Sequence, residues 1–368
     1  MRLTSKNLAP YLLDKGFVDY DSFMKGDYSV VQQQNRNSIL RVYRATCPAL
    51  FVKQPSDINP QNIYLLQKDA TSQYLFKNDS DYAKTASYVP AYYGYDSNEH
   101  VLVTELLPNA KNLHEIISEK KSFDLKHAED MGEIIASYHF DISEKQKENK
   151  SLQFFSGMIP WVLRISDKKE KFEWNSAGAD KGSTIIKIIR EDEAFLSPIK
   201  ALLKQWKTTS LIHGDIKWVN FIVGKQYGAS EESLQLIDWE VADIGDPLWD
   251  VAGVFQSYLS GWIMSFDPDV NKHQQLPNYE FFKLEDMKPA MQAFWKKYCE
   301  ARGFTKKEIQ QAYRTAVGYT ACRLIQTAIE SNLSYQQHTT SSGRMLQLCK
   351  NLLTDSEKAA QELFGMKY

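Results

Sequence analysis

Two short segments of the chain combine acidic and amide side chains with apolar runs. Residues 211–223 read LIHGDIKWVNFIV, in which a polar turn with Asp215 and Asn220 separates two apolar runs. Residues 234–240 read LQLIDWE, so a further apolar run ends at Asp238. Phosphoryl transfer needs a carboxylate that orients the attacking hydroxyl group. It also needs carboxylate and amide oxygens that hold Mg²⁺ against nucleotide phosphates. The residue types and their spacing therefore indicate phosphoryl-transfer chemistry.

Chance is a poor explanation for this pattern. With ordinary residue frequencies, the spacing H-G-D-x4-N is expected roughly 0.002 times in a chain of this length. The sequence signatures of two hydrolase classes are absent, because the chain contains neither G-x-S-x-G nor H-E-x-x-H. Serine hydrolase and zinc protease activities are therefore disfavoured.

The segments HGDIKWVN and IDWEVADIGDPLWDVA resemble the aminoglycoside phosphotransferase and choline kinase-like family, which is related to the protein kinases. Protein kinases have Arg before the catalytic Asp and Asp-Phe-Gly at the metal position. This chain has Gly214 and Asp-Trp-Glu, which favours the small-molecule branch. The resemblance implies that Asp215 is the catalytic carboxylate, that Asn220 and Asp238 bind Mg²⁺, and that His213 and Asp250 support the catalytic loop.

The same resemblance implies an α+β, bilobal, protein-kinase-like fold. Residues 1–107 would form a nucleotide-binding lobe with a small antiparallel sheet and one helix. Residues 108–368 would form a larger, mostly helical lobe for catalysis and acceptor binding. Within this lobe, we predict a helix over residues 183–206, directly before the strand of the first motif. ATP and Mg²⁺ are the implied cofactors.

In the N-terminal lobe, the strand-like run ALFVKQ carries Lys53, which the resemblance assigns to the nucleotide phosphates. The helix predicted over residues 59–77 carries Asp69, which would pair with Lys53. The backbone from Glu105 to Leu107 would face the adenine between the lobes.

Two features depart from the family pattern. The turn Gln-Asn-Arg-Asn at residues 34–37 has no glycine, although glycine lets a backbone approach phosphate closely. Arg36 is therefore expected to supply charge to the phosphates. The family usually has glutamate at the position of Asp69, so the reach of the shorter side chain to Lys53 is open.

Composition narrows the function classes. The chain has 368 residues, of which 43% are hydrophobic and 12% aromatic, enough for two lobes with a sizeable core. A net charge of −2 gives no electrostatic case for nucleic acid or an anionic membrane as a partner. Four scattered cysteines, no apolar leader and no membrane-length apolar run predict a cytoplasmic protein. The oligomeric state stays open.

The acceptor is the least determined part of the function. Carboxylates and aromatic residues near the motifs, with Glu240 and Trp218 as candidates, would suit a cationic hydroxyl compound. Asp243, Asp267 and Asp269 could add to this charge. A core role for the tryptophan and a solvated role for the acids are equally compatible with the sequence.

Three functions compete. The first is an ATP-dependent phosphotransferase that acts on a small-molecule hydroxyl group. The second has the same chemistry with a Ser or Thr of a peptide or protein as acceptor. The third is a catalytically silent nucleotide-binding scaffold, which the glycine-free turn and Asp69 favour. The presence of all three residues Asp215, Asn220 and Asp238 favours an enzyme.

Overall fold

The N-terminal part of the chain forms a five-stranded antiparallel sheet. The computed structural model describes residues 1–34, 37–142, 148–167, 169–172, 179–265 and 282–367. The strands lie in the order β1-β2-β3-β5-β4. They are β1 (Ser29–Gln34), β2 (Asn37–Tyr43), β3 (Leu50–Pro55), β4 (Tyr92–Asp96) and β5 (Val101–Glu105).

The two faces of this sheet pack against different parts of the molecule. Leu40, Val42 and Val52 alternate with residues of the opposite face and are buried against the N-terminal helix α1 (Leu8–Asp14). The outer face of the sheet and α1 together form a small apolar core. Helix α2 (Tyr20–Met24) follows α1 in the sequence. Because side chains alternate along a strand, Ile39 and Lys53 point to the other face, toward the rest of the molecule.

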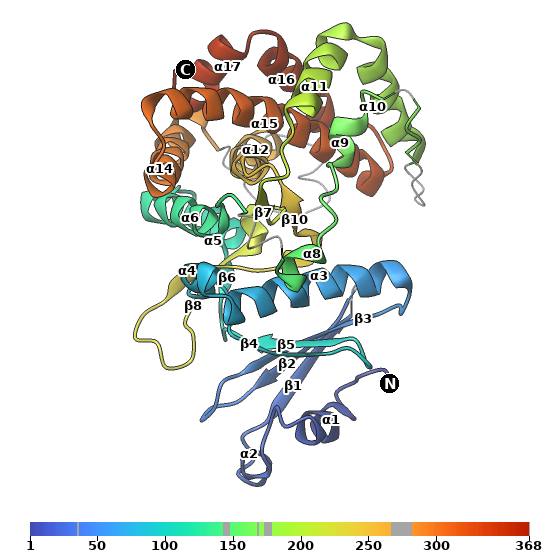
Figure 1. The fold of residues 1–368 in the computed structure, drawn as a ribbon, viewed down its shortest axis with the longest axis vertical. Helices are drawn as coiled ribbons and strands as arrows, with labels where there is room; N and C mark the ends of the chain where they lie inside the picture. Colours follow the sequence, from blue (N-terminus) through green and yellow to red (C-terminus); the bar gives the residue numbers. More distant parts are fainter. Residues whose placement is uncertain (35–36, 143–147, 168, 173–178, 266–281, 368) are drawn as a thin grey trace.

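Helix α3 (Pro60–Asn78) lies between the sheet and the helical part of the molecule (Figure 1). Asn59 starts the helix by accepting a hydrogen bond from the Asn62 N–H, and Pro60 occupies the first turn, where it is favoured. On the far side of the helix, Lys68 Nζ is 2.8 Å from Asp243 Oδ2, and both residues are buried. This ion pair joins α3 to strand β10 (Asp243–Gly245) of the C-terminal part.

The C-terminal part is mostly helical. Helix α12 (Leu248–Ser265) runs through its middle, buried along nearly its whole length, with α14 and α15 packed against it (Figure 1). The other described helices are η1 (Ser80–Tyr82), α4 (Ala83–Ala86), α5 (Leu113–Lys120), α6 (Leu125–Tyr138), α8 (Lys150–Gln153), α9 (Trp161–Arg164), α10 (Ala179–Glu191), α11 (Glu193–Gln205), α14 (Leu284–Arg302), α15 (Lys306–Tyr335), α16 (Thr340–Thr354) and α17 (Ser356–Phe364).

Two small antiparallel sheets position the motif residues in this part. Strand β7 (Ser210–Ile212) pairs with β10, and β8 (Phe221–Gly224) lies between β6 (Lys111–Asn112) and β9 (Ser233–Leu236). Two short 3₁₀ turns, η2 (Trp218–Asn220) and η3 (Trp239–Val241), follow the two motif loops. The two motifs therefore end on neighbouring strands and face the sheet of the N-terminal part.

The predicted fold class is confirmed: a small antiparallel sheet with one long helix is followed by a larger helical part. The boundary at residues 107 and 108 stays a prediction; it falls between β5 and β6. The single helix over residues 183–206 is wrong, because the chain breaks at Asp192, whose side chain caps α11 through the Ala194 N–H.

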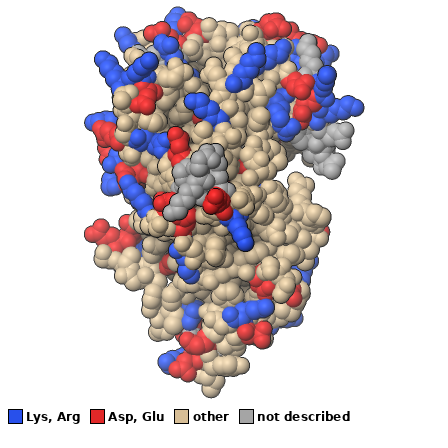
Figure 2. Space-filling model, viewed as in Figure 1, with Lys and Arg blue, Asp and Glu red and all other residues tan. Residues whose placement is uncertain are grey.

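The surface gives no sign of a large single-sign field on the face seen in Figure 2, where basic and acidic side chains are interspersed. Within the described ranges, no helix is both long and apolar enough to cross a membrane.

Candidate active site

The loop after β7 requires a glycine at its second residue. Gly214 has φ +80°, a conformation that side chains with a Cβ rarely adopt. A Cβ on this residue would lie 2.8 Å from the Val241 carbonyl oxygen, which is backbone and cannot easily move away. The close approach brings the loop with Asp215 against η3, the turn that follows Asp238.

Asp250, at the start of α12, holds this loop from inside the protein. Its carboxylate accepts hydrogen bonds from the backbone N–H groups of His213 (2.6 Å) and Gly214 (2.9 Å). The Tyr138 hydroxyl donates to the same carboxylate at 3.0 Å, and His139 Nε2 lies 3.2 Å away. Burial alone would raise the pKa of Asp250, but His139 and the loop donors lower it below its ordinary value. Asp250 is therefore a buried anion whose hydrogen bonds fix the loop.

His213 links the two motifs. Its Nε2 is 3.0 Å from the Ile237 carbonyl oxygen, directly before Asp238, and its Nδ1 lies 3.2 Å from the Asp215 N–H. The carbonyl can only accept, so Nε2 carries the proton and Nδ1 accepts. The imidazole thus joins the loop with Asp215 to the strand end with Asp238.

Arg323 of α15 supports the loop from the opposite side, and nothing in the sequence singled it out. Its guanidinium donates to the carbonyl oxygens of Gly214 and Ile216, both at 3.0 Å, and lies 3.9 Å from the Asp215 carboxylate. It also lies over the Trp249 ring. Arg323 lies about a hundred positions after Asp215 in the sequence. The apolar spacing of its helix indicates a buried face but does not predict a contact with this loop.

Lys217 was also missed. Its Nζ lies 2.6 Å from Asp215 Oδ2, and both side chains are partly open to solvent. Together with Arg323, it places two cationic groups at the Asp215 carboxylate. The only sequence signal was its position two residues after Asp215, on the same loop.

Lys53 connects the sheet, α3 and the second motif. Its buried Nζ lies 2.9 Å from Asp69, 2.8 Å from Asp238 and 3.3 Å from Glu240. Burial opposes the charge of Lys53, but Asp69 and Asp238 outweigh it and raise its pKa above the ordinary value. The pKa of Asp238 is lowered, because Lys53 outweighs the effect of burial. The side chain of Asp69 is thus long enough to pair with Lys53, a question that the sequence alone left open.

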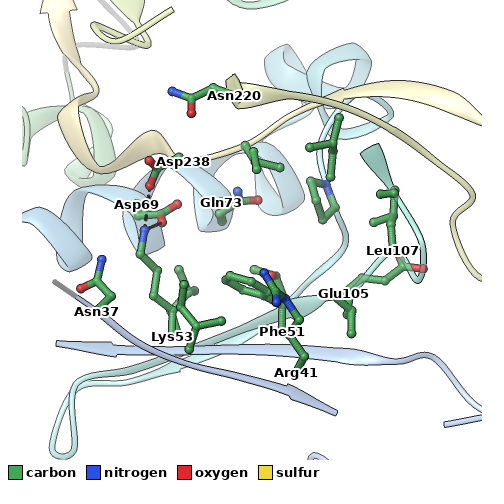
Figure 3. Close-up of a pocket in the computed structure, with 18 of the residues that line it drawn as sticks. Asn37, Arg41, Phe51, Lys53, Asp69, Gln73, Glu105, Leu107, Asn220 and Asp238 are labelled. Atoms are coloured by element: carbon green, nitrogen blue, oxygen red, sulfur yellow. Dashed lines mark hydrogen bonds and ion pairs between the residues drawn. The ribbon is translucent and has the colours of Figure 1, made fainter. Parts of the chain in front are cut away.

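A cavity of about 760 Å³ lies between the sheet and the C-terminal part (Figure 3). Lys53, Asp69, Asn220 and Asp238 line one region of it. The Asn220 Nδ2 donates to the Asp215 carbonyl oxygen at 2.9 Å, so the amide is held by its nitrogen and its oxygen is available. No cluster of three or more His, Cys, Asp or Glu side chains suited to a metal occurs in the described parts of the chain. One carboxylate and one amide oxygen nevertheless fit Mg²⁺, which takes few protein ligands and completes its shell with phosphate and water.

The backbone of Asp238 is unusual. The residue has φ 70° and ψ 60°, the left-handed region, at the start of η3. Non-glycine residues seldom adopt this conformation, although aspartate tolerates it better than most. The turn directs the carboxylate toward Lys53 in the cavity.

The predicted hinge lines the other region of the same cavity, through Glu105 and Leu107. Leu107 is buried, and in the described part of the chain its backbone N–H has no acceptor; its carbonyl accepts from Ala110. A buried donor without a partner suits a ligand with an acceptor edge. The Glu105 carboxylate accepts a hydrogen bond from the Tyr227 N–H.

The remaining predicted residues are distributed differently. Arg36 lies outside the described residues, as do Asp267 and Asp269. Glu240, expected at the acceptor, instead contacts Lys53, and Trp218 is buried against Phe123 and Tyr258. Their acceptor role stays an untested prediction to which this packing lends no support. Asp243 is engaged by Lys68.

Glu330 of α15 is a further carboxylate that sequence reasoning missed. It lies seven residues, two helical turns, after Arg323 and so on the same face of the helix. Solvent reaches its side chain, and Gln326 Nε2 donates to it at 2.8 Å. The surrounding protein raises the pKa of Glu330, and the nearby Asp215 adds to the effect. Glu330 is thus a carboxylate open to solvent and close enough to Asp215 for the two charges to interact.

Replacing Asp250 by Asn should destabilise the fold by about 2 kcal/mol or more at pH 7, because the amide cannot satisfy both backbone donors and the charge is lost. Its folded-state pKa is lowered. Its contribution is therefore present above the unfolded value near 4, and the difference between wild type and D250N should shrink as the pH falls below it. Urea unfolding at several pH values measures this.

Asp246 provides the matched control. It is also buried, but it accepts from the Leu248 N–H and the Tyr319 hydroxyl and makes no hydrogen bond to the loop with Asp215. Burial raises its pKa, so neutralisation by D246N should cost less. Equal destabilisation by the two substitutions would contradict the anchoring role of Asp250.

The comparisons with known proteins agree with the fold described above. A choline kinase from Cryptosporidium parvum superposes with a TM-score of 0.59 at 14% identity, over 97% of each chain. An ethanolamine kinase from Plasmodium vivax gives 0.55 at 14% identity, over 96% of this chain and 90% of that one. A choline/ethanolamine kinase family protein from Mesorhizobium loti gives 0.51 at 14% identity, over 98% of each. At this identity the likeness shows the fold.

No curated protein sequence matches the chain significantly. The family model described as "Phosphotransferase enzyme family" matches residues 87–284, more than half of the chain and the whole stretch from the predicted hinge through both motifs. Asn220 and Asp238 line the cavity, and Asn220 holds Asp215 beside it. With the family match over both motifs and more than half of the chain, the chain belongs to the phosphotransferase enzyme family.

Proposed function

We propose that the protein transfers the γ-phosphate of a nucleoside triphosphate, ATP in the expectation from sequence, to a hydroxyl group with the help of Mg²⁺. The observation that carries this proposal is the contact of Lys53 with Asp69 and Asp238 in the cavity that Asn220 also lines. A buried cation, a carboxylate and an amide oxygen around one space meet the needs of a magnesium–triphosphate complex.

The nucleotide would lie along the cavity. Its phosphates would bind at Lys53, and Asn220 and Asp238 would hold Mg²⁺, which neutralises charge on the phosphates. The base would reach the Leu107 N–H, whose hydrogen-bonding capacity is otherwise unused in the described residues. On this proposal, residues 1–107 are the nucleotide-binding lobe and residues 108–368 carry catalysis and acceptor binding.

The transfer itself would depend mainly on positioning. The acceptor hydroxyl is oriented by Asp215, which takes its proton. The acceptor oxygen bonds to the γ-phosphorus as the bond to the β,γ-bridging oxygen breaks and the nucleoside diphosphate leaves. Lys217 and Arg323, close to Asp215, hold its carboxylate and add positive charge where the transferred group is most negative.

The acceptor is proposed to be a small cationic hydroxyl compound. Glu330 supports this, because a carboxylate open to solvent and near Asp215 attracts a cation to the site of transfer. The structural relatives named above are choline and ethanolamine kinases, which fits an amino-alcohol. A basic Ser or Thr peptide meets the same charge requirement and is the second candidate. A silent scaffold is disfavoured by the Asp215–Lys217 arrangement, which pure nucleotide binding does not require.

Asp215→Asn tests catalysis apart from binding. The substitution keeps shape but loses the proton acceptor, so turnover should fall at least about 10²-fold. Nucleotide affinity should stay near that of wild type, because Asp215 is not among the residues that line the cavity. Steady-state kinetics and calorimetry measure the two quantities, with the exposed Asp14→Asn on α1 as control. A parallel loss of nucleotide binding would show that Asp215 is structural.

Asp238→Ala tests the metal site. A nucleotide should raise the midpoint of thermal unfolding more with Mg²⁺ than without, because tighter binding adds stability. The variant should lose this Mg²⁺-dependent increment while remaining folded. Asp14→Ala, which removes an exposed aspartate on α1, should keep it. An undiminished increment in D238A would exclude Asp238 from the metal site.

Glu330→Gln tests the acceptor. With a panel of choline, ethanolamine and a basic serine peptide, the KM of the best acceptor should rise several-fold and the KM of the nucleotide should change little. The effect should weaken at high salt, since screening reduces attraction to an exposed carboxylate. The exposed Glu362→Gln on α17 is the matched control. A neutral best acceptor, or an unchanged KM in E330Q, would refute the charge argument and leave the phosphotransferase proposal intact.

A further inference from the structure

Arg41 of β2 projects into the cavity. The strand alternates, so that Leu40 and Val42 are buried in the outer apolar core while Ile39, Arg41 and Tyr43 line the cavity. Figure 3 shows the nitrogen atoms of Arg41 beside Phe51, within the space enclosed by the labelled residues. The guanidinium of Arg41 can therefore contact a ligand bound in the cavity.

Arg41 has no protein partner in the described part of the chain, where it makes neither a hydrogen bond nor an ion pair. This contrasts with Lys53, which three carboxylates surround in the same cavity. Withdrawing a charge from water without compensation is costly, so a half-buried and unpaired arginine suits a ligand that supplies acceptors.

The strand register locates Arg41 away from the phosphates. Ile39 pairs with Lys53, whereas Arg41 pairs with Phe51, which in turn pairs with Thr104 directly before the hinge. Two residues along a strand correspond to about 6.7 Å. Arg41 therefore lies a strand step from Lys53 toward Leu107, at the level where a nucleotide with its phosphates on Lys53 has its base.

Phe51 makes this level suitable for a base. Its ring lines the cavity from β3, next to Arg41. Aromatic side chains stack on any nucleobase and do not distinguish one from another. Discrimination must come from hydrogen-bonding groups, and Arg41 is the cation at this position.

We propose that Arg41 selects the base of the donor nucleotide and favours guanine over adenine. Guanine presents two acceptors, O6 and N7, side by side, and these match the paired donors of a guanidinium. Adenine presents N7 beside an amino group, which is itself a donor and opposes arginine. This inference rests on the proposed function and refines it: both nucleotides fit the cavity, and the guanine nucleotide is bound more tightly.

The test is calorimetric titration of the full chain with the Mg²⁺ complexes of GTP, ITP and ATP. ITP carries O6 and N7 but lacks the 2-amino group of guanine, so it isolates the contact assigned to Arg41. GTP and ITP should bind alike, and about tenfold more tightly than ATP, within the range for a bidentate arginine contact. ATP binding equal to GTP, or ITP binding like ATP, would overturn the proposal.

Variants separate base selection from other roles. Arg41→Ala should weaken GTP and ITP about tenfold and ATP little, which removes the preference. Arg41→Lys keeps the positive charge but not the paired N–H donors of the guanidinium, so it should lose most of the preference for GTP and ITP over ATP. Arg2→Ala, an exposed arginine that does not line the cavity, should keep it. Equal weakening of all three nucleotides by R41A would indicate a general charge effect and overturn the proposal.

The two proposals fail in different ways. If nucleotides bind in a Lys53-dependent manner without preference, the assignment of Arg41 is wrong and the phosphotransferase proposal stands. If none of the three nucleotides binds to the folded wild-type chain, both are wrong. Thermal unfolding of each variant shows that the fold is kept, as expected for a side chain without protein partners.

Discussion

The ammonium group of Lys53 is buried, and a buried charge is tolerated only when opposite charges meet it. Its partners come from two separate parts of the chain: Asp69 from α3, and Asp238 and Glu240 from the turn at the end of the second motif. Satisfying this one cation thus fixes the sheet, the helix behind it and the C-terminal part relative to one another. The cavity lies between these elements, with Lys53 lining one region and the predicted hinge residues Glu105 and Leu107 lining the other.

A second buried pair, Lys68 with Asp243, holds the same helix to the C-terminal part. Asp243 also accepts from the Gly157 N–H and the Ser156 hydroxyl, so it is well satisfied without contributing to the cavity. Helix α3 therefore has one charged contact toward the cavity and one on its far side. Removing either lysine would leave a buried carboxylate of the pair without its cation, which is costly.

Sequence reasoning was effective where the determinants are local. The strand-like run with Lys53 was recognised in the sequence, and the motifs with the family resemblance led to Lys53, Asp69 and Asp238, which line one cavity, and to Asp215, which contacts Asn220 beside it. The helix break at Asp192 was missed because apolar positions continue at helical spacing on both sides, and only the capping contact with Ala194 interrupts them.

Residues whose role depends on distant contacts could not be predicted. Arg323 and Glu330 belong to a long helix whose pattern indicates only a buried face, so their position near Asp215 follows from how α15 packs on α12. Glu240 was assigned to the acceptor because it follows the second motif. The left-handed turn at Asp238 instead brings it to Lys53. Backbone conformation of this kind has no reliable signature in residue type.

The left-handed turn at Asp238 also has a consequence for the stability of the fold. A residue with a Cβ at φ 70° carries a conformational cost, of about 1 kcal/mol for unfavourable residue types, that glycine would not have. Glycine would relieve this backbone cost, but it would also remove the carboxylate that meets the buried charge of Lys53. The backbone cost at Asp238 is thus tied to the contact of its carboxylate with Lys53, so a single residue carries both the local strain and the charge that the cavity needs.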